Sequence, residues 1–474
     1  MNADNPSPQS DPYRCPGEQH PISRAVHLGR LAAFYPACRQ CPRRGDTGTI
    51  SPRRVAQLAE TSCRGQPRSL FHDEGAGGVY LNDLTAAAAK NIAAAFGTVA
   101  KPQAVSPTSN LQISKSPNLQ ITASSLLLAG DGRPLTAELV AAAAEGLRST
   151  GCNVVDIGPS TSPCLAFAVR HLEAAGGLMV GNPGDDSHTV GMKFWAAGPR
   201  PLSAGGSLEP IIERYKAGDD RNCSRAGAAF VILSAAKDLG GVALPHEILP
   251  CDQDNASPRE RSHIEPTTRH YGELHRFQAD GPYLVQMSKH YHALRPLRVV
   301  VDSASKPAVE FLRKLAATVA CEVVPSRSTR NDLPRQIRDD AAHFAVYIDG
   351  DGETCHALDE QGHAILPERL LLLLATQLSA GTVVLETGTL QAVADRLEQL
   401  GMQVAVSSPR RADMAAAMQE HDAMLGGGPS GRFWHAQLGL PLCDALMTVT
   451  RLLQTLSRSD DPLSQVLDRN APLG

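Results

Sequence analysis

The chain has 474 residues, which is too long for one hydrophobic core and predicts several α/β units. Hydrophobic residues make up 42% and charged residues 20%, the values of an ordinary globular protein rather than a disordered or fibrous one. The net charge of -4 gives no general attraction for nucleic acid, and the longest apolar run is far shorter than the roughly 20 residues that span a bilayer. We therefore expect a multidomain cytoplasmic protein with no membrane segment, no secretory signal and no nucleic-acid partner.

The amino-terminal segment, residues 1–68, is rich in Pro and Arg and contains a C-x2-C pair. A structural zinc ion is held by four nitrogen or sulfur ligands in a tetrahedron. The candidate ligands are Cys15, His20, Cys38 and Cys41. His27 or Cys63 could replace one of the two upstream ligands. We therefore predict a small Cys/Arg-rich module with a zinc site, the alternative being unliganded thiols in a flexible segment.

From Leu70 the chain alternates between helical and extended patterns, which predicts a first α/β unit over residues 69–202. Its predicted elements, in chain order, are a helix over Thr85–Phe96 ended by Gly97, a strand over Ser125–Ala129, a helix over Leu135–Thr150, and strands over Cys152–Ile157 and Gly177–Val180. Residues 101–122 contain the tetrapeptide NLQI twice and break the pattern, so we predict an inserted loop there.

Two further α/β units are predicted, over residues 203–330 and 331–474. The former has a second insertion near 221–270, followed by a strand over Arg298–Asp302, a helix over Val309–Ala317 and a strand over Cys321–Pro325. The latter begins with the apolar strand Phe344–Ile348, runs through a second strand that ends near Val406, and finishes in a C-terminal tail.

Six motifs lie in or beside these elements. They are Phe71–Gly75, Ala129–Arg133, Asp156–Pro163, Gly176–Lys193, Asp349–Thr354 and Leu425–Arg432. Their order resembles the α-D-phosphohexomutase superfamily, whose members move a phosphoryl group between C1 and C6 of a hexose. The resemblance implies successive α/β/α domains followed by a fourth, phosphate-binding domain. We expect three such domains after the Cys-rich module and no domain IV, because the chain stops near the point where that domain would begin.

The resemblance places the phosphorylated serine of the superfamily within the fourth motif, Gly176–Lys193. Depending on the alignment, the matching position is Val180 or Pro183, and neither side chain has the hydroxyl that phosphoryl transfer needs. Ser187 and His188 lie a few positions further on and are the candidate substitutes. The alternative is that they belong to a polar surface loop.

Three acidic residues, Asp349, Asp351 and Glu353, follow the strand that ends at residue 348. The resemblance implies a magnesium site here, with Glu353 in place of a third aspartate and Thr354 in place of an arginine. Clustered carboxylates can hold a hard divalent cation. We therefore predict an altered Mg²⁺ site, the alternative being an acidic turn at a strand end.

Residues 425–432 resemble the loop with which the superfamily reads its sugar. Ser430 is retained, but Gly428 stands where the resemblance implies a glutamate, and Arg432 where it implies a histidine. Loss of the carboxylate weakens the expectation that a hexose is recognised. The candidate substrate-binding residues are Arg133, Lys193, Gly427, Ser430 and Arg432.

Together these departures predict a phosphohexomutase-like protein of carbohydrate metabolism that lacks mutase turnover and binds a hexose phosphate or acts as a regulatory homologue. Two alternatives stay open. One is an active intramolecular phosphotransferase with an altered site, and the other is a scaffold that uses its N-terminal module to bind a protein partner. The residues name neither the sugar nor the partner.

Overall fold

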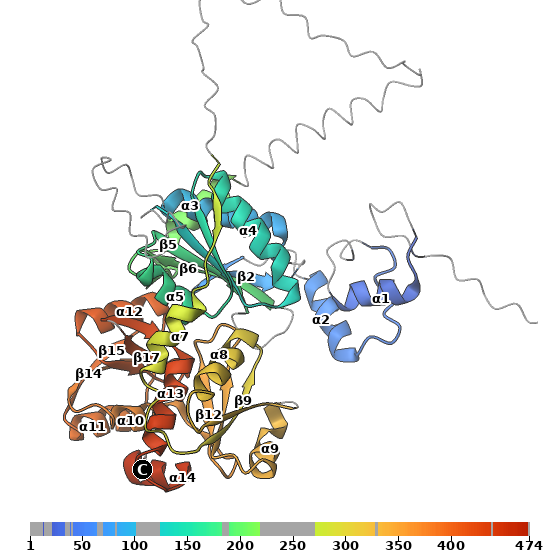
Figure 1. Cartoon of the computed structure of the whole chain (residues 1–474). Helices are drawn as coiled ribbons and strands as arrows, with labels where there is room; N and C mark the ends of the chain where they lie inside the picture. The colour runs from blue at the N-terminus through green and yellow to red at the C-terminus, as the bar shows by residue number, and fades with distance from the viewer. Residues whose placement is uncertain are drawn as a thin grey trace, which may run out of the picture.

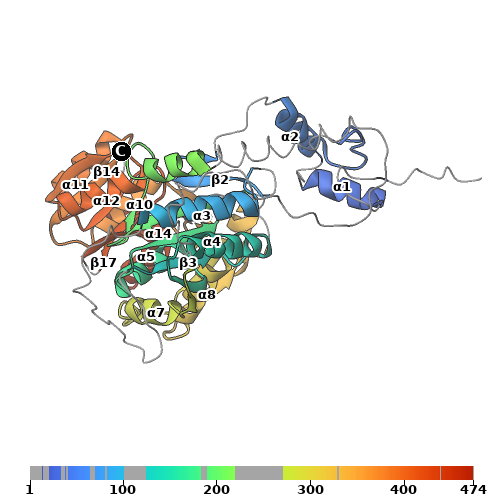
Figure 2. The same cartoon turned by 90° about the horizontal axis from the view of Figure 1, so that it is seen from above.

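The computed structural model of the chain describes residues 13, 21–33, 38, 41–63, 70–80, 83–100, 124–182, 189–218, 271–327, 330–437 and 439–472. Within these ranges, three β-sheets with their helices form three α/β units (Figure 1). A small helical module lies beside the first unit in both views (Figure 2). The predicted α/β class, with successive α/β/α units after an N-terminal module, is confirmed. None of the helices in the described ranges has the length and apolar character needed to cross a membrane.

The first sheet has the strand order β1-β2-β6-β5-β3-β4-β8, with β7 paired to β6. Its strands are β1 Phe71–His72, β2 Gly75–Val79, β3 Leu126–Gly130, β4 Val154–Pro159, β5 Gly176–Gly181, β6 Thr189–Ala196, β7 Arg200–Pro201 and β8 Leu274–Arg276. Strands β3, β4, β5 and β8 run parallel, whereas β6 pairs antiparallel with both β5 and β2. The end of β5 and the middle of β6 therefore lie side by side.

Helices cover both faces of this sheet because its central strands are apolar on both sides. In β3, Leu126 and Leu128 pack in the same core cluster as helices α3 (Ala86–Ala100) and α4 (Ala137–Ser149). The alternate residues Leu127 and Ala129 pack in another cluster, which contains α5 (Ser162–His171). A short 3-10 turn, η2 (Pro134–Thr136), leads into α4, and residues 209–218 are helical.

Gly97 does not end a helix, contrary to the prediction, because α3 continues to Ala100. A Cβ atom at Gly97 would lie 2.7 Å from the Thr150 Oγ1 atom, and one at Gly146 would lie 2.1 Å from the Lys90 carbonyl oxygen. Both glycines therefore allow α3 and α4 to pack closely. The sequence analysis took Gly97 as the residue that ends the helix. A glycine stands there instead because α3 contacts α4 at this position.

The second sheet has the order β10-β9-β11-β12-β13, and its last two strands are antiparallel to their neighbours. Its strands are β9 Arg298–Ser303, β10 Glu322–Pro325, β11 Phe344–Ile348, β12 Cys355–Leu358 and β13 Ala364–Ile365. The accompanying helices are α7 Asp280–Ser288, α8 Lys306–Ala316, η3 Arg330–Asp332 and α9 Leu333–Asp339.

The third sheet has the order β15-β14-β16-β17-β18, again with two antiparallel strands at one side. Its strands are β14 Gly381–Glu386, β15 Met402–Ser407, β16 Leu425–Gly427, β17 Trp434–Gln437 and β18 Leu440–Cys443. The accompanying helices are α10 Pro367–Ala375, α11 Gln391–Gln399, α12 Arg411–Glu420, α13 Ala445–Leu456 and α14 Leu463–Asn470.

The sheets divide the chain at positions other than the predicted boundaries at 203 and 331. Strand β8 pairs with β4, so the chain returns to the first sheet after residue 270. Strand β11 pairs with β9, so the second sheet continues from residue 298 to residue 365. Local patterns predicted most of these strands, but only the pairing of distant strands decides which sheet each one joins.

The N-terminal module contains helices α1 (Arg24–Ala32) and α2 (Pro52–Cys63). Helix α1 begins after Ser23, whose side chain accepts a hydrogen bond from the Val26 backbone N–H. The buried residues Leu31, Cys38 and Leu58 form its small apolar cluster, and Val79 of β2 packs against it. This contact joins the module to the first unit.

Candidate functional site

The acidic loop, residues 349–353, follows β11 at the centre of the molecule. Its three carboxylate residues are all buried. The loop backbone is clamped by two helix starts, because the Ser162 N–H donates to the Asp351 carbonyl and the Ala445 N–H donates to the Gly352 carbonyl, at 2.8 and 3.1 Å. Gly352 has a φ of 78°, a conformation that favours glycine. The loop is thus fixed by units one and three as well as its own sheet.

The side chain of Lys193 enters this loop from β6. Its Nζ atom lies 2.6 Å from the Asp351 Oδ2 atom and 2.7 Å from the Glu353 Oε2 atom. All three side chains are at most 5% exposed. The sequence analysis treated Lys193 as a substrate-binding residue and the carboxylates as metal ligands, and the structure brings the two groups into direct contact.

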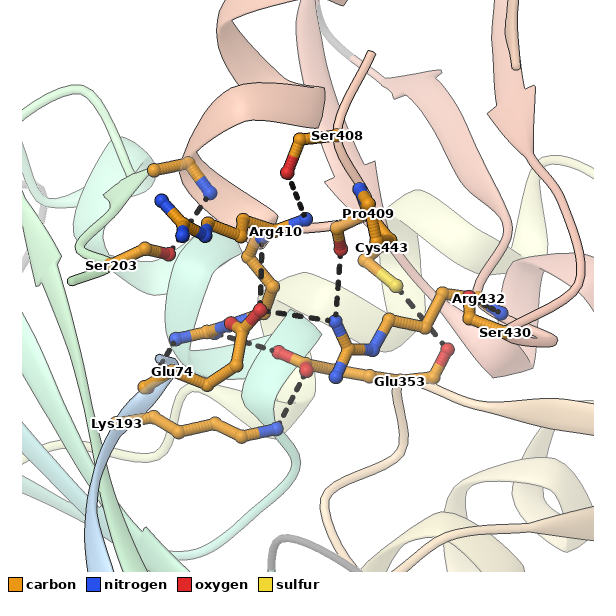
Figure 3. A network of polar contacts seen from close by, with 12 residues as sticks. Glu74, Lys193, Ser203, Glu353, Ser408, Pro409, Arg410, Ser430, Arg432 and Cys443 are labelled. Carbon is orange, nitrogen blue, oxygen red and sulfur yellow. Dashed lines mark hydrogen bonds and ion pairs between the residues drawn. The ribbon is translucent and has the colours of Figure 1, made fainter. Parts of the chain in front are cut away.

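Two arginines extend this contact into a network that joins the three units (Figure 3). The buried Arg411, at the start of α12, lies 2.6 Å from Glu74 and 3.0 Å from Glu353. Its guanidinium also stacks over the Trp195 ring, 4.7 Å from the ring centroid. Arg432 reaches the other Glu74 oxygen at 3.3 Å. Glu74 follows β1, Lys193 lies in β6, Glu353 follows β11, and Arg411 begins α12.

Burial and ion pairing shift the ionisation of these groups in opposite directions. Burial raises the pKa of Asp351 to about 7, although Lys193 opposes the shift. Burial would also raise the pKa of Glu353, but Arg411 and Lys193 outweigh it and lower that pKa to about 2. The pKa of Lys193 is raised, because the attraction of Asp351 and Glu353 exceeds the effect of burial. Lys193 is therefore a cation in this site.

The acidic loop does not fit the predicted magnesium site. Magnesium requires oxygen ligands at about 2.0–2.1 Å in near-ideal octahedral geometry. Here an ammonium lies between the Asp351 and Glu353 oxygens, and the second Glu353 oxygen faces Arg411. In the part of the chain that the structure describes, no group of three or more His, Cys, Asp and Glu residues is arranged to hold a metal ion.

The sugar-loop motif lies next to the acidic loop, as expected from their places at strand ends. Thr354 forms an isolated antiparallel bridge with Arg432, and the Cys355 N–H donates to the Gly431 carbonyl at 2.9 Å. Gly431 has a φ of 75°. The acidic loop and the sugar loop are therefore in direct contact.

Glu386, which the sequence analysis did not identify, extends its side chain from a neighbouring strand to the sugar loop. It is the last residue of β14, and it accepts hydrogen bonds from the Ser430 backbone N–H at 3.0 Å and from the Ser430 hydroxyl at 2.5 Å. A Cβ atom at Gly428 would lie only 2.6 Å from the Glu386 Cβ atom. The space left by the missing side chain at Gly428 is therefore filled by Glu386. Burial raises the pKa of this carboxyl group.

The sequence could have identified Glu386 as a site residue, but not Arg411. Glu386 ends an apolar strand, a position where the side chains of parallel sheets commonly meet ligands, so this signal was available. Arg411 carried none, because its partner Glu74 is 337 positions away and only the packing of α12 against the first unit brings them together.

The remaining phosphate-site candidates have other partners or lie outside the described residues. Arg133 is held by Asp131 at 2.5 Å and by the Thr189 carbonyl at 3.1 Å. Val180 is fully buried in β5, where it packs with other apolar side chains. Pro183, Ser187 and His188 lie outside the described residues.

The predicted zinc site can be followed only in part. Cys38 and Cys41 are buried and reduced, and Cys38 packs in the apolar cluster with Leu31 and Leu58. His27 stacks on the Tyr13 ring and contacts the Asp46 carbonyl at 3.2 Å. Cys15 and His20 lie outside the described residues. The described part of the module gives the zinc site no support, and metal analysis of the purified chain would check it.

Comparison with known proteins is consistent with this arrangement of loops. Residues 68–221 match the family model of phosphoglucomutase/phosphomannomutase, alpha/beta/alpha domain I. The phosphomannomutase/phosphoglucomutase of Pseudomonas putida is 20% identical over 351 residues, which cover 70% of this chain and 65% of that protein. The phosphoglucosamine mutase of Synechocystis sp. is 26% identical over 383 residues, covering 73% of this chain and 70% of that protein.

Solved structures agree at the level of fold. A phosphoglucomutase/phosphomannomutase family protein from Burkholderia thailandensis matches with a TM-score of 0.66 and 20% identity, covering 85% of this chain and 80% of that one. The phosphoglucomutase parafusin from Paramecium matches with a TM-score of 0.57 and 13% identity, covering 84% and 73%. The chain thus spans about two thirds of the length of the curated relatives described above and shares the fold of these structures.

Proposed function

Because this chain belongs to the α-D-phosphohexomutase superfamily, we propose that it binds a hexose phosphate at the sugar loop without transferring the phosphoryl group. It would then be a phosphohexomutase-like protein of carbohydrate metabolism that acts by binding, as a sensor or regulatory homologue. The relatives described above are a phosphomannomutase/phosphoglucomutase and a phosphoglucosamine mutase, and the sugar-phosphate class of ligand is proposed for this chain by analogy with them.

The observation that supports ligand binding is the Glu386–Ser430 pair. A buried carboxylate accepts two hydrogen bonds from one serine and keeps further lone pairs for hydroxyl donors, which is the chemistry that distinguishes sugar hydroxyl groups. The backbone N–H of Arg432 donates to the Ser430 hydroxyl at 3.1 Å, and the positive charge of its side chain, which pairs with Glu74, also acts on Glu386. A hydroxyl-reading carboxylate next to a cation suits a phosphorylated sugar.

The absence of transfer is supported by the residues at the nucleophile position. Phosphoryl transfer through the protein needs an oxygen held in line with the phosphorus atom. Val180 offers a buried isopropyl group, and Pro183 has no hydroxyl in either alignment. Ser187 is the remaining candidate oxygen, displaced along the chain by several residues.

The binding test is calorimetric titration with glucose 1-phosphate and glucose 6-phosphate, with glucose and inorganic phosphate as comparisons. We expect saturable binding of at least one hexose phosphate, and a roughly 10- to 100-fold weaker affinity in Glu386→Gln, the usual effect of removing a charged hydrogen-bond partner. Glu398→Gln, an exposed carboxylate on α11, is the matched control. Unchanged affinity in Glu386→Gln would overturn the role of this pair.

The transfer test combines an isomerisation assay with intact mass. With the hexose 1,6-bisphosphate as primer, we expect no interconversion of the 1- and 6-phosphates above background and no covalent phosphate on the purified chain. Turnover that disappears in Ser187→Ala would instead establish an active mutase with a displaced nucleophile.

A further inference from the structure

The three carboxylates of the acidic loop are buried, so their charges require partners. Asp349, Asp351 and Glu353 are 6%, 2% and 2% exposed. An unpaired buried charge is strongly unfavourable, and the group must pair, bind a metal ion or become neutral. The structure supplies positive partners from within the chain, and the most central of them is Lys193.

The Lys193 ammonium lies where a cation bound by both Asp351 and Glu353 would lie. It contacts one oxygen of Asp351 and one oxygen of Glu353, at 2.6 and 2.7 Å. Two further oxygens of the loop are also engaged. The second Glu353 oxygen faces Arg411 at 3.0 Å, and an Asp349 oxygen accepts the Glu353 backbone N–H at 2.9 Å.

The loop has little room to rearrange around a metal ion. A Cβ atom at Gly181 would lie 2.8 Å from the second Asp351 oxygen, which places that oxygen against the end of β5. A Cβ atom at Gly350 would lie 2.5 Å from the Asn182 Cβ atom, so the loop backbone also packs on this strand end. Reaching six oxygens at metal distance would require Lys193 to leave.

We propose that Lys193 is a built-in cation that takes the place of a divalent metal ion in the acidic loop and prevents one from binding there. A divalent ion bound to the same two oxygens would lie next to the ammonium, and the repulsion between the two cations in this buried site would oppose its binding. Since the ammonium is tethered through β6, chelators cannot remove it. The charge of the loop is therefore independent of the free metal concentration.

The proposal does not depend on the proposed hexose phosphate, because the test measures metal binding in the absence of sugar. The full chain is treated with chelator, transferred to chelator-free buffer and titrated with Mn²⁺, whose free ion is followed by electron paramagnetic resonance. We expect wild type and Asp351→Asn to give the same free Mn²⁺ signal, since neither binds the ion at this loop.

Removal of the ammonium should create a metal site. In Lys193→Met we expect about one more bound Mn²⁺ per chain than in wild type, and a correspondingly smaller free Mn²⁺ signal. The double variant Lys193→Met/Asp351→Asn should lose that ion again, and Lys193→Arg should behave as wild type because it keeps a cation. A folded Lys193→Met that binds no additional Mn²⁺ would show that the lysine is not what excludes the metal.

The comparison of wild type with Asp351→Asn decides the matter even if Lys193→Met does not fold. Mn²⁺ that is bound by wild type and lost in Asp351→Asn would overturn the proposal, because the loop would then hold a metal despite Lys193. Equal signals in these two proteins support it.

Discussion

Among single residues, His435 in β17 shows how burial sets an ionisation state. Its ring is buried, and the Nε2 atom lies 2.9 Å from the Thr448 hydroxyl oxygen. Burial lowers its pKa to about 3, and repulsion from Arg451 and His290 acts in the same direction. The imidazole is therefore neutral in the folded protein at any moderately acidic pH, whereas in the unfolded chain it gains a proton near its ordinary pKa.

This difference predicts a loss of stability in acid. Because the unfolded state binds the proton first, the contribution of His435 is fully present above about pH 6.5 and decreases as the pH falls toward about 3. Between pH 6.5 and pH 4.5 the free energy of unfolding should fall by about 2–3 kcal/mol more in wild type than in His435→Gln. Urea unfolding at several pH values would measure it. Parallel pH profiles for the two proteins would contradict the neutral buried histidine.

Among elements, the contact between α3 and α4 depends on two glycines, Gly97, which the sequence analysis took as a helix end, and Gly146, which lies inside the predicted helix. Replacing a helical glycine with alanine should stabilise a helix by up to about 1 kcal/mol if nothing else changes. Gly146 and Gly29 are both helical, but only Gly146 faces another backbone at close range. The two positions therefore separate helix propensity from packing.

Opposite effects are expected for the same substitution at these two positions. Gly146→Ala should destabilise the first unit by about 1–3 kcal/mol, because its new methyl group would meet the Lys90 carbonyl oxygen at 2.1 Å. Gly29→Ala, with nothing within 4 Å of its Cβ position, should stabilise α1. Hydrogen exchange of the α4 and α1 amides would report each effect locally. Slower exchange of α4 in Gly146→Ala would contradict the close contact.

Across the whole molecule, the polar network around Arg411 and one continuous core hold the three units together. The core cluster that contains α5 also contains α7, α8, α10 and α13. The Tyr283 hydroxyl in α7 donates to Asp444, which caps the start of α13, at 2.8 Å. Arg411 adds ion pairs to Glu74 and Glu353 from two other units. The units are thus predicted to separate less readily than domains joined only by linkers.

Removing Arg411 should therefore weaken the assembly of the units. In Arg411→Met, the buried carboxylate of Glu353 and the partly buried carboxylate of Glu74 lose a partner, and a cost of about 3–5 kcal/mol is expected. The neighbouring Arg410→Met is the matched control, since the Arg410 side chain donates to the neutral Ala204 carbonyl at 3.3 Å and its loss should cost about 1 kcal/mol. The protein has two tryptophans, and Trp195 lies under Arg411, so fluorescence during urea unfolding reports on this site. Equal midpoints for the two variants would contradict the role of the network.

The sequence by itself determined the class of fold and the positions of the chemical loops. Apolar strands followed by Gly- and Asp-rich turns are local patterns, and they correctly placed Asp349, Asp351 and Glu353 at a strand end and Ser430 in a neighbouring loop. Helix and strand positions followed for the same reason, since short-range periodicity decides them.

Only the tertiary structure decided which charges meet. Lys193 and Glu353 are separated by 160 positions, and Arg411 and Glu74 by 337, so no local pattern links them. The antiparallel pairing of β6 with β5 and the packing of α12 against the first unit bring them together. Strand pairing and helix packing depend on the whole chain. For that reason the sequence analysis predicted a metal ion at the acidic loop, whereas the structure places the Lys193 ammonium against its carboxylates.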